Sequence, residues 1–481
     1  MKKELIVALD VGTSSCRAVC FRPDGSRAAG ASLPLMPARI EPGMSEYQAG
    51  VILQTARRVL DTVLEKVGPQ SVAAIGIASQ RSTVVLWNTQ TGAACGPVLA
   101  WEDGRAQQQA QQAPLTQEEI HLQTGLYKTP FFSAPKMAWI LQTSPAASQA
   151  LKQGCLLSAP VASYLIWHLT GGQTCATDYS LAQRTLLLDI HTLQWSECLC
   201  RGFRIPDAIL PQLSSSAADY GAYRFQGVSI PITACVADQQ AAAVYFNILP
   251  QESLINYGTG AFWLYRAGEK PVSLPGMLTS VSATAERKKV HYLLEGPVNA
   301  AASALLWLKA QGIDFDDIET DALCQQSAHP VWFLPAFGGL GAPYWDFMVP
   351  TAVEGLSPLT RKADWVAGVV RAIAFLLADI AHYLQTNGQE LKGPVRASGG
   401  LSRVNYLTQF QADLLQREID VSPETEATLC GTALLAAKPV NGKLTFLQEN
   451  SKIQPKLSSH EVHTLYTQWQ DFVTRLRSKK S

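Results

Sequence analysis

The order of expected strands and helices indicates an α/β protein built from two similar halves. Residues 5–21 contain an apolar run ending on Asp10, a glycine turn and a second alternating run, which is the pattern of a β-hairpin. A helical pattern and a short buried strand follow, as in a domain with a mixed sheet. The hairpin pattern recurs from Ser253 as a weak internal repeat. We therefore expect a duplicated architecture with a cleft between the halves.

Length and composition agree with two large domains. The chain has 481 residues, of which 47% are hydrophobic, so it can bury sizeable cores. A strand at 232–237 and a helix of small residues precede Pro250. We place the domain boundary there, which gives domains 1–249 and 250–481.

Charge and cysteine content exclude several function classes. Lys and Arg number 39, as do Asp and Glu, which disfavours nucleic acid or an anionic membrane as a partner. The ten cysteines include no C-x-x-C pair and are expected to be buried thiols in a reducing compartment. Asp10 comes too early for a signal peptide, and no apolar run approaches the ~20 residues of a membrane span. These features predict a cytoplasmic protein.

The first half is expected to continue in the order strand, helix, strand. Residues 27–33 look like a third strand, and Ser45 and Glu46 are expected to open a helix that Gly68-Pro69 ends. The apolar run 71–78 suits a buried parallel strand. It places Ser79-Gln80-Arg81 at its end, where ligands bind in open α/β sheets. The glutamine-rich residues 107–112 fit the solvated face of a helix.

The second half follows the same plan. Its hairpin has Gly258-Thr259-Gly260 at the tip, and a helix is expected over 299–309. Apolar residues at helical spacing predict a strong amphipathic helix from Val366 to Leu384. Residues 394–400 read as a strand entering a glycine turn, after which Ser402 can cap a helix over 404–415.

The two hairpin tips are candidate phosphate sites. Backbone amides and the hydroxyls of Thr13 and Thr259 can hold phosphate oxygens, and Asp10 can hold a hydrated Mg²⁺. The chain has no P-loop, protein-kinase or G-x-G-x-x-G motif, so a nucleotide would have to bind between opposed hairpins. Each tip also fits an ordinary turn with solvated hydroxyls.

Two glycines are candidates for the base of a nucleotide. Gly399-Gly400 precede a helix and carry no side chain that would collide with adenine. The same pair fits a plain tight connection between strand and helix. Together with two phosphate-binding tips, it favours adenine binding.

Asp238 is the candidate catalytic residue. It follows a mostly apolar strand and precedes a helix, so its carboxylate is partly desolvated and can accept a proton from an alcohol that attacks phosphorus. Its alternative role is a helix N-cap, worth about 1 kcal/mol. Arg81, Trp101, Asp103 and Gln239 would complete a polar pocket with aromatic walls, suited to a polyhydroxylated ligand. Trp101 equally fits a core position.

At these residues the chain resembles the FGGY carbohydrate kinase family, most closely its glycerol kinase branch. The resemblance covers nearly the whole chain, with the motifs in family order. It implies two RNase H-like domains of the hexokinase, Hsp70 and actin type, with ATP and the acceptor in the interdomain cleft. The motifs are residues 10–15, 79–81, 101–105, 177–179, 237–240, 257–260, 335–346, 399–400 and 431–433.

The resemblance also assigns roles. Asp10 and Asp238 would serve a Mg²⁺ ion, and Asp238 would be the catalytic base. A homodimer is implied in the same way. The nucleotide would contact Thr13, Ser14, Ser15, Arg17, Thr259, Ala302, Gly399 and Gly400, and the acceptor would contact Gln80, Arg81, Ser82, Trp101, Asp103, Phe131, Gln239 and Phe262.

Departures from the family pattern concern the substrate. Ser82 stands where glycerol kinases have a Glu that accepts from two substrate hydroxyls, and Phe131 replaces a Tyr. Each lost charge-assisted hydrogen bond removes roughly 1.5–3 kcal/mol, which argues against glycerol itself. Residues 133–136 and 103–105 are similar to pentulose kinases, including xylulose kinase. Ala302 and Val404 replace a Gly and an Asn near the glycerol kinase nucleotide.

The sequence therefore predicts a Mg²⁺- and ATP-dependent kinase that phosphorylates a small polyol or ketose, with domain closure excluding water. An ATPase that uses water as acceptor is disfavoured, since hydrolysis would not need the polar pocket around Arg81. A sugar-sensing, actin-like protein without turnover is the alternative from another class.

Overall fold

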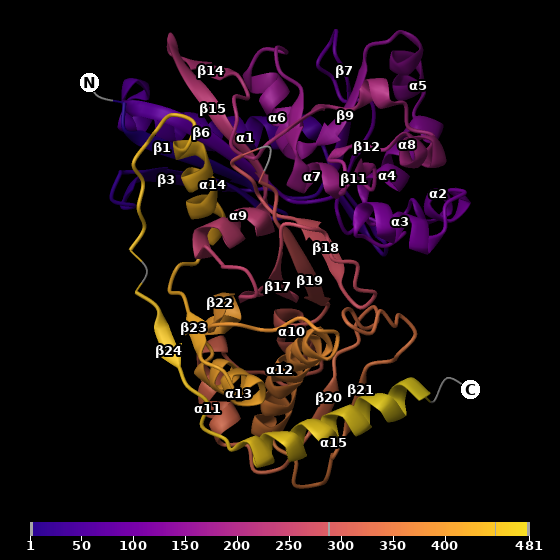
Figure 1. The fold of residues 1–481 in the computed structure, drawn as a ribbon, viewed down its shortest axis with the longest axis vertical. Coiled ribbons are helices and arrows are strands. Elements are labelled where there is room, and N and C mark those ends of the chain that lie inside the picture. Colours follow the sequence, from indigo (N-terminus) through magenta and orange to yellow (C-terminus); the bar gives the residue numbers. More distant parts are fainter. Residues whose placement is uncertain (1–2, 287–288, 448, 479–481) are drawn as a thin grey trace.

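The computed structural model describes residues 3–286, 289–447 and 449–478 and consists of two halves, each built on a mixed sheet (Figure 1). In the first sheet, the order is β14-β15-β6-β1-β2-β3. The β1–β2 hairpin and β3 are antiparallel, whereas β6 and β15 run parallel to β1. The strands are β1 (Leu5–Val11), β2 (Ser15–Phe21), β3 (Arg27–Pro34), β6 (Val72–Ser79), β14 (Ala222–Phe225) and β15 (Val228–Ala237).

The second sheet repeats this topology, in the order β18-β19-β17-β16-β22-β23-β24. The antiparallel strands β16, β17 and β19 correspond to β1, β2 and β3, and the parallel β22 and β23 correspond to β6 and β15. The predicted internal repeat is confirmed. The strands are β16 (Ser253–Tyr257), β17 (Ala261–Gly268), β18 (Leu278–Val281), β19 (Tyr292–Val298), β22 (Val395–Gly399), β23 (Ile419–Val421) and β24 (Ser451–Ile453).

A smaller sheet in the first half has the order β4-β5-β8-β7-β9, and the loop that carries Trp101 follows its strand β8. Its strands are β4 (Arg39–Glu41), β5 (Met44–Tyr47), β7 (Val84–Asn88), β8 (Val98–Leu99) and β9 (Leu156–Pro160). Three further pairs are β10 (Ala176–Asp178) with β13 (Gln212–Ser214), β11 (Leu188–Asp189) with β12 (Gln194–Trp195), and β20 (Trp332–Leu334) with β21 (Ala352–Glu354).

Helices cover both sheets, and their apolar faces form the cores. The helices of the first half are α1 (Ala49–Val67), α2 (Gln107–Gln112), α3 (Gln117–Thr124), α4 (Ser133–Thr143), α5 (Pro145–Lys152), α6 (Val161–Leu169), α7 (Tyr179–Gln183), α8 (Glu197–Phe203) and α9 (Asp238–Phe246). Those of the second half are α10 (Ala302–Ala310), α11 (Thr320–Gln325), α12 (Lys362–Thr386), α13 (Asn405–Leu415), α14 (Ala427–Ala437) and α15 (Ser459–Ser478).

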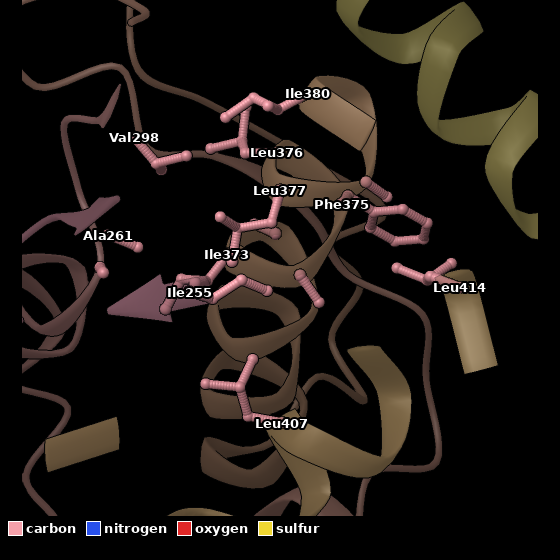
Figure 2. Packing of buried hydrophobic residues seen from close by; sticks show 14 of the residues in the cluster. Ile255, Ala261, Val298, Ile373, Phe375, Leu376, Leu377, Ile380, Leu407 and Leu414 are labelled. Carbon is pink, nitrogen blue, oxygen red and sulfur yellow. The ribbon is translucent and has the colours of Figure 1, made fainter. Parts of the chain in front are cut away.

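Helix α12 is the centre of the second core. Its residues Ile373, Leu377 and Ile380 pack beside Ile255 and Val298 of the sheet (Figure 2). Contrary to the expectation that no apolar stretch nears membrane length, α12 is long and apolar enough to cross a bilayer by composition alone. Since 83% of its apolar window is buried inside the protein, it is a core helix.

Helices α9 and α14 join the halves. Residue 250 separates the strands of the two large sheets, but α14 comes from the second half and packs on β1 and β6 of the first (Figure 1). Gly76 of β6 faces Thr432, where an added Cβ would be only 2.9 Å from that side chain. A third core therefore contains α9, α14 and residues of both sheets, such as Ile6 and Leu254.

Two predicted helix starts are wrong. Ser45 and Glu46 belong to β5, which pairs with β4 and β8, and α1 begins only at Ala49. Ser402 does not cap α13, because its hydroxyl donates to the Gly399 carbonyl. Asp321 instead accepts from the first amides of α13. Tertiary partners decided both helix ends, which local patterns do not contain.

All ten cysteines are free thiols, as expected, and eight of them are buried. Cys175 is partly buried and Cys198 is exposed.

Candidate active site

Asp10 ends the first strand with an unsatisfied charge. Its Oδ1 atom is buried and has no hydrogen-bond partner. Burial, and then the nearby Asp238 carboxylate, raise the pKa of Asp10 to about 7, against a weaker opposing effect of Arg17. Two neighbouring carboxylates, one with an orphaned oxygen, fit a Mg²⁺ ion that keeps several water ligands. No group of three or more His, Cys, Asp or Glu able to hold a metal occurs in the described part of the chain.

The hydroxyl residues of the first tip lie beside an aromatic and a basic side chain. Thr13 Oγ1 accepts a hydrogen bond of 3.1 Å from Trp101 Nε1. Ser14 is exposed, and Ser15 Oγ accepts from Arg17 Nε at 3.2 Å. The Arg17 guanidinium is also 3.6 Å from Glu426, so it has a carboxylate partner from the second half.

The second tip is one residue shorter than the first and has a different polar residue at its base. Gly258 donates to the Gly260 carbonyl, and Thr259 is exposed at the turn. The amide of Ala302, at the start of α10, donates to the Gly258 carbonyl. Asn256 occupies the place that Asp10 has in the first hairpin, and its Nδ2 donates to Gln239 Oε1 at 3.1 Å. The second tip is thereby connected to the residue next to Asp238.

The two glycines after β22 differ in their surroundings. Gly399 has a φ of 92°, and an added Cβ would overlap the Tyr257 carbonyl oxygen of the paired strand. Gly400 is exposed, with open space where its Cβ would be. Gly399 is required by the backbone, whereas Gly400 leaves room for a flat ligand.

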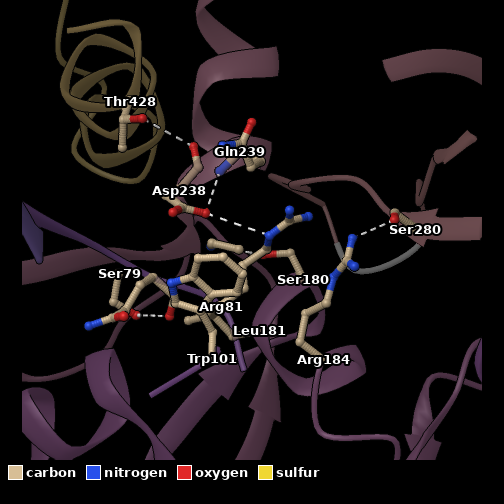
Figure 3. Close-up of polar contacts among 12 residues, drawn as sticks. Ser79, Arg81, Trp101, Ser180, Leu181, Arg184, Asp238, Gln239, Ser280 and Thr428 are labelled. Atoms are coloured by element: carbon tan, nitrogen blue, oxygen red, sulfur yellow. Dashed lines mark hydrogen bonds and ion pairs between the residues drawn. The ribbon is translucent and has the colours of Figure 1, made fainter. Parts of the chain in front are cut away.

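Asp238 lies where a strand meets a helix (Figure 3). It is the first residue of α9, and Ala237 occupies the N-cap position, so the N-cap interpretation of Asp238 is wrong. Its Oδ1 accepts from the Gln239 amide at 2.7 Å and is 3.7 Å from Arg81 Nε. Burial raises its pKa, and Arg81 opposes that shift. The carboxylate is still 28% exposed, so a substrate hydroxyl can reach it.

A buried ion cluster crosses between the halves beside this base. Arg81 donates to Glu295 Oε2 at 2.8 Å, and its guanidinium is 5.7 Å from the Phe262 ring centroid. Arg184 also binds Glu295, and it donates to Ser280 Oγ at 2.6 Å (Figure 3). Although burial acts to raise it, the two guanidinium groups hold the pKa of Glu295 down to about 2.

Arg184 and Glu295 are site residues that the sequence prediction missed. Glu295 is a lone charge in the apolar run Tyr292–Val298, and such a residue at 1% exposure must be paired. That signal was available in the sequence. Its partners were not, because they lie 111 and 214 residues away.

The predicted aromatic walls face solvent. Trp101 is 44% exposed and Phe131 is 46% exposed, so the core interpretation of Trp101 is wrong. Gln80 is buried and braces the first tip, since its Nε2 donates to the Gly12 carbonyl at 3.4 Å. Ser82 is buried in a left-handed turn with a φ of 62°.

Asp103 is a correction to the predicted pocket. Its carboxylate is fully buried and accepts from the Ser45 amide at 2.8 Å. Arg105 takes up the rest of its hydrogen-bonding capacity and also pairs with Glu46. Because these partners occupy both carboxylate oxygens, Asp103 fixes the loop that follows Trp101 and has no oxygen free for a substrate.

A large cavity lies away from these residues. It has about 1110 Å³, and aromatic residues of α12, α13 and α15 line it, including Phe375, Phe410 and Trp469. None of the predicted site residues is among its lining residues.

Comparison with known proteins decides the family. The sequence model for the N-terminal domain of the FGGY family of carbohydrate kinases matches residues 5–245, and the model for the C-terminal domain matches residues 253–439. This chain belongs to the FGGY family. As an FGGY carbohydrate kinase it carries out ATP-dependent phosphoryl transfer to a polyol or sugar, a reaction that generally requires Mg²⁺.

Relatives of this FGGY kinase match over its full length. It is 33% identical to a glycerol kinase of Lactobacillus acidophilus over 99% of each chain, and 35% identical to a glycerol kinase of Mycoplasma pneumoniae over 92% of this chain and 90% of the relative. The structure of Plasmodium falciparum glycerol kinase with ADP has a TM-score of 0.90 at 27% identity, covering 99% of this chain and 98% of that one.

Xylulose kinase from Rhodospirillum rubrum shares the fold, with a TM-score of 0.86 at 21% identity over 98% of this chain and 99% of that one. The predicted fold, family and kinase activity are confirmed, and no comparison supports a sensing protein without turnover.

Proposed function

We propose that Asp238 accepts the proton of a primary hydroxyl of a small polyol or ketose as that hydroxyl attacks the γ-phosphate of ATP. The observation that supports this role is the partly exposed carboxylate of Asp238, which is 3.7 Å from Arg81 Nε and contributes to the raised pKa of Asp10, a residue whose Oδ1 has no hydrogen-bond partner. A general base next to a carboxylate that could bind Mg²⁺ suits phosphoryl transfer, because alignment of the reactants and compensation of their charge contribute most to that reaction.

The nucleotide is proposed to bind between the two tips. Exposed hydroxyls of Ser14 and Thr259, with the nearby Thr13, Ser15 and Arg17, would meet the phosphates. The start of α10 at Ala302 and the glycines Gly399 and Gly400 would border the base, where Gly400 leaves open space.

Asp10 and Asp238 would hold the Mg²⁺ ion, mostly through water. When bound, this ion neutralises charge on the transferred phosphoryl group. The metal would also stabilise the ionised form of Asp10, which burial otherwise disfavours.

The acceptor is proposed to contact Arg81, Ser82 and Gln239 through polar groups and Trp101, Phe131 and Phe262 through ring faces. Glu295 and Arg184 keep the Arg81 guanidinium in place. Gln80 and Asp103 act indirectly, through the first tip and the loop after Trp101. The pocket has no carboxylate at position 82, so a polyol or ketose other than glycerol is the expected acceptor.

The test is an ADP-release screen with glycerol, erythritol, xylulose, ribulose and related acceptors. We expect at least one of them to stimulate turnover well above the rate with water. Asp238→Asn should lower that turnover by about 10²–10⁴-fold, the range for loss of a general base.

The matched control is Asp379→Asn. Asp379 is also a buried acid, and burial raises its pKa to about 6, but it binds Tyr466 and Trp469 in the second core. The control should retain the activity of the wild type once it is folded. If no acceptor raises turnover above the water background, or if both variants lose activity equally, the proposal is wrong.

The homodimer and the cytoplasmic location stay predictions.

A further inference from the structure

Lys136, the fourth residue of α4, is a fully buried lysine that has no ion-pair partner among the described residues. Its ammonium donates to four backbone carbonyls instead, those of Ala100, Phe131, Trp101 and Ser82, at 2.5–3.4 Å. An ammonium has three protons, so these four carbonyls use its whole donor capacity.

The four carbonyls come from three separate loops. Ser82 follows Arg81 after strand β6, Ala100 and Trp101 follow strand β8, and Phe131 precedes α4. Each loop carries a side chain proposed to meet the acceptor: Arg81 and Ser82 on the first, Trp101 on the second and Phe131 on the third. Ser133, the first residue of α4, also donates to the Ser82 carbonyl, at 3.2 Å.

Burying this cation is expensive, which speaks against an incidental role. An unpaired ammonium in a protein interior costs several kcal/mol unless hydrogen bonds compensate for its lost hydration. Burial lowers the pKa of Lys136 to about 7, while Asp103 and Glu102 act in the opposite direction from the loop after β8. An apolar side chain would fill the same space without that cost.

We propose that Lys136 is the positioning residue of the acceptor site: its ammonium fixes the loops bearing Ser82, Trp101 and Phe131 relative to one another. This inference rests on the proposed function of that site. Lys136 touches no reacting atom. Its main effect is on how well the three walls fit the acceptor, since none of the four carbonyls belongs to a tip that is proposed to hold the nucleotide. The one link to those tips is the bond from Trp101 Nε1 to Thr13 Oγ1.

The first variant is Lys136→Met, which keeps an unbranched apolar stem and removes the ammonium. Using the acceptor that the wild type prefers, we expect the KM for the acceptor to rise at least about tenfold. The KM for ATP should rise by no more than about threefold, because only one of the three walls, Trp101, contacts a nucleotide tip, through its single bond to Thr13.

Lys128→Met is the matched control. Lys128 also donates its ammonium protons to two backbone carbonyls, those of Ala113 and Leu115. Neither carbonyl belongs to a loop with a proposed acceptor contact. This variant should leave both KM values within about twofold of the wild type.

The second variant, Lys136→Ala, tests the charge itself and covers the case in which Lys136→Met folds poorly. Propylammonium, which matches the three carbons and the ammonium that Lys136→Ala removes, should lower the acceptor KM towards the wild-type value, and propanol at the same concentration should not. A structural role in filling space would give equal rescue by both compounds.

The outcomes separate this inference from the proposed function. A wild type without acceptor-stimulated ADP release refutes the function. With an active wild type, four results overturn the role of Lys136: an unchanged acceptor KM in folded Lys136→Met, an equal rise in the KM for ATP, equal rescue by propanol, or failure of both variants to fold even with propylammonium. A selective rise in the acceptor KM with rescue by the ammonium alone supports it.

Discussion

The two hairpin tips both contain a glycine followed by a threonine, but the second turn is one residue shorter, and the residue two before the glycine is acidic only in the first. Asp10 pairs in register with Ala78 of a parallel strand, and Asn256 pairs in the same way with Ser398. Asp10 has a buried oxygen without a partner, whereas the Asn256 amide is bonded to Gln239. Of the two equivalent positions, only Asp10, in the half that contains Asp238, therefore has a carboxylate that could bind Mg²⁺.

The parallel strands next to the tips differ in a related way. Ser79 at the end of β6 is equivalent to Gly399 at the end of β22, since each pairs with the residue before a tip glycine. The first strand continues into Gln80 and Arg81, and the second continues into Gly400. The end of β6 therefore supplies side chains to the proposed acceptor site, whereas the end of β22 leaves open space for the proposed nucleotide base.

The largest expected effect comes from making the first tip like the second. Asp10→Asn should lower kcat/KM by about 10³-fold, about 4 kcal/mol, because the Mg²⁺ ion loses its carboxylate. Steady-state ADP release with saturating Mg²⁺ measures it. Activity within tenfold of the wild type would show that the two tips are chemically interchangeable.

The same variant makes a prediction about pH. The pKa of Asp10 lies near 7 in the folded protein against an ordinary value of 3.8. A carboxyl whose folded pKa is raised loses stability as pH rises from the lower value through the higher one. Without Mg²⁺, the free energy of unfolding of the wild type should therefore fall between pH 5 and pH 8, and that of Asp10→Asn should fall less. Denaturant unfolding at the two pH values measures both changes. Equal losses would contradict the buried charge.

The next effect concerns the strand ends. Gly399→Ala should lower the unfolding free energy by about 3 kcal/mol, because Ala is strained at positive φ and its Cβ overlaps a paired strand. Gly400→Ala is the control, with open space around it, and should unfold like the wild type while raising the KM for ATP. Thermal unfolding and ATP titration distinguish them. Equal melting temperatures would remove the distinction between the two glycines.

A smaller effect is expected when the second tip acquires the charge of the first. Asn256→Asp should raise the KM for ATP about tenfold through repulsion of the phosphates, and Asn256→Leu separates that effect from loss of the bond to Gln239. Measured at low and high salt, the increase should shrink at high salt only for the Asp variant. A salt-independent increase would argue against phosphate at this tip.

The smallest effects come from the tip hydroxyls. Thr13→Ala and Thr259→Ala should each raise the KM for ATP by a few fold, about 0.5–1.5 kcal/mol per lost hydrogen bond. Only Thr13→Ala should also raise the KM for the acceptor, because Trp101 donates to Thr13 Oγ1. Kinetics with each substrate varied in turn provide the comparison, and identical profiles for the two variants would contradict it.

The hairpins, the buried strands and the long helix α12 could be predicted from the sequence. Alternating apolar and polar residues, glycine turns and helical spacing of apolar residues are local signals. It placed Asp10 and Asp238 at strand ends, where the structure has them. It failed at Ser45 and Glu46, since the pairing of β5 with β8 overrides a local capping pattern.

The remaining errors are contacts between distant segments. Asp103 reads as a pocket residue until the Ser45 amide, 58 residues earlier, is placed against it. The cluster of Arg81, Arg184 and Glu295 likewise needs both halves to be folded together. Which partner satisfies a buried charge is a tertiary property, although the need for one can be read from the strand.

The crossing of α9 and α14 limits how the enzyme can move. An added Cβ at Gly431 would overlap the Ala241 carbonyl, so these helices are too close to slide past each other. Thr428 Oγ1 also donates to the Asp238 carbonyl at 3.3 Å. A rotation of one half relative to the other would have its axis at this contact between α9 and α14, close to Asp238. The two hairpin tips lie further from that axis. In such a rotation Asp238 would move less than the two tips that are proposed to bind the nucleotide.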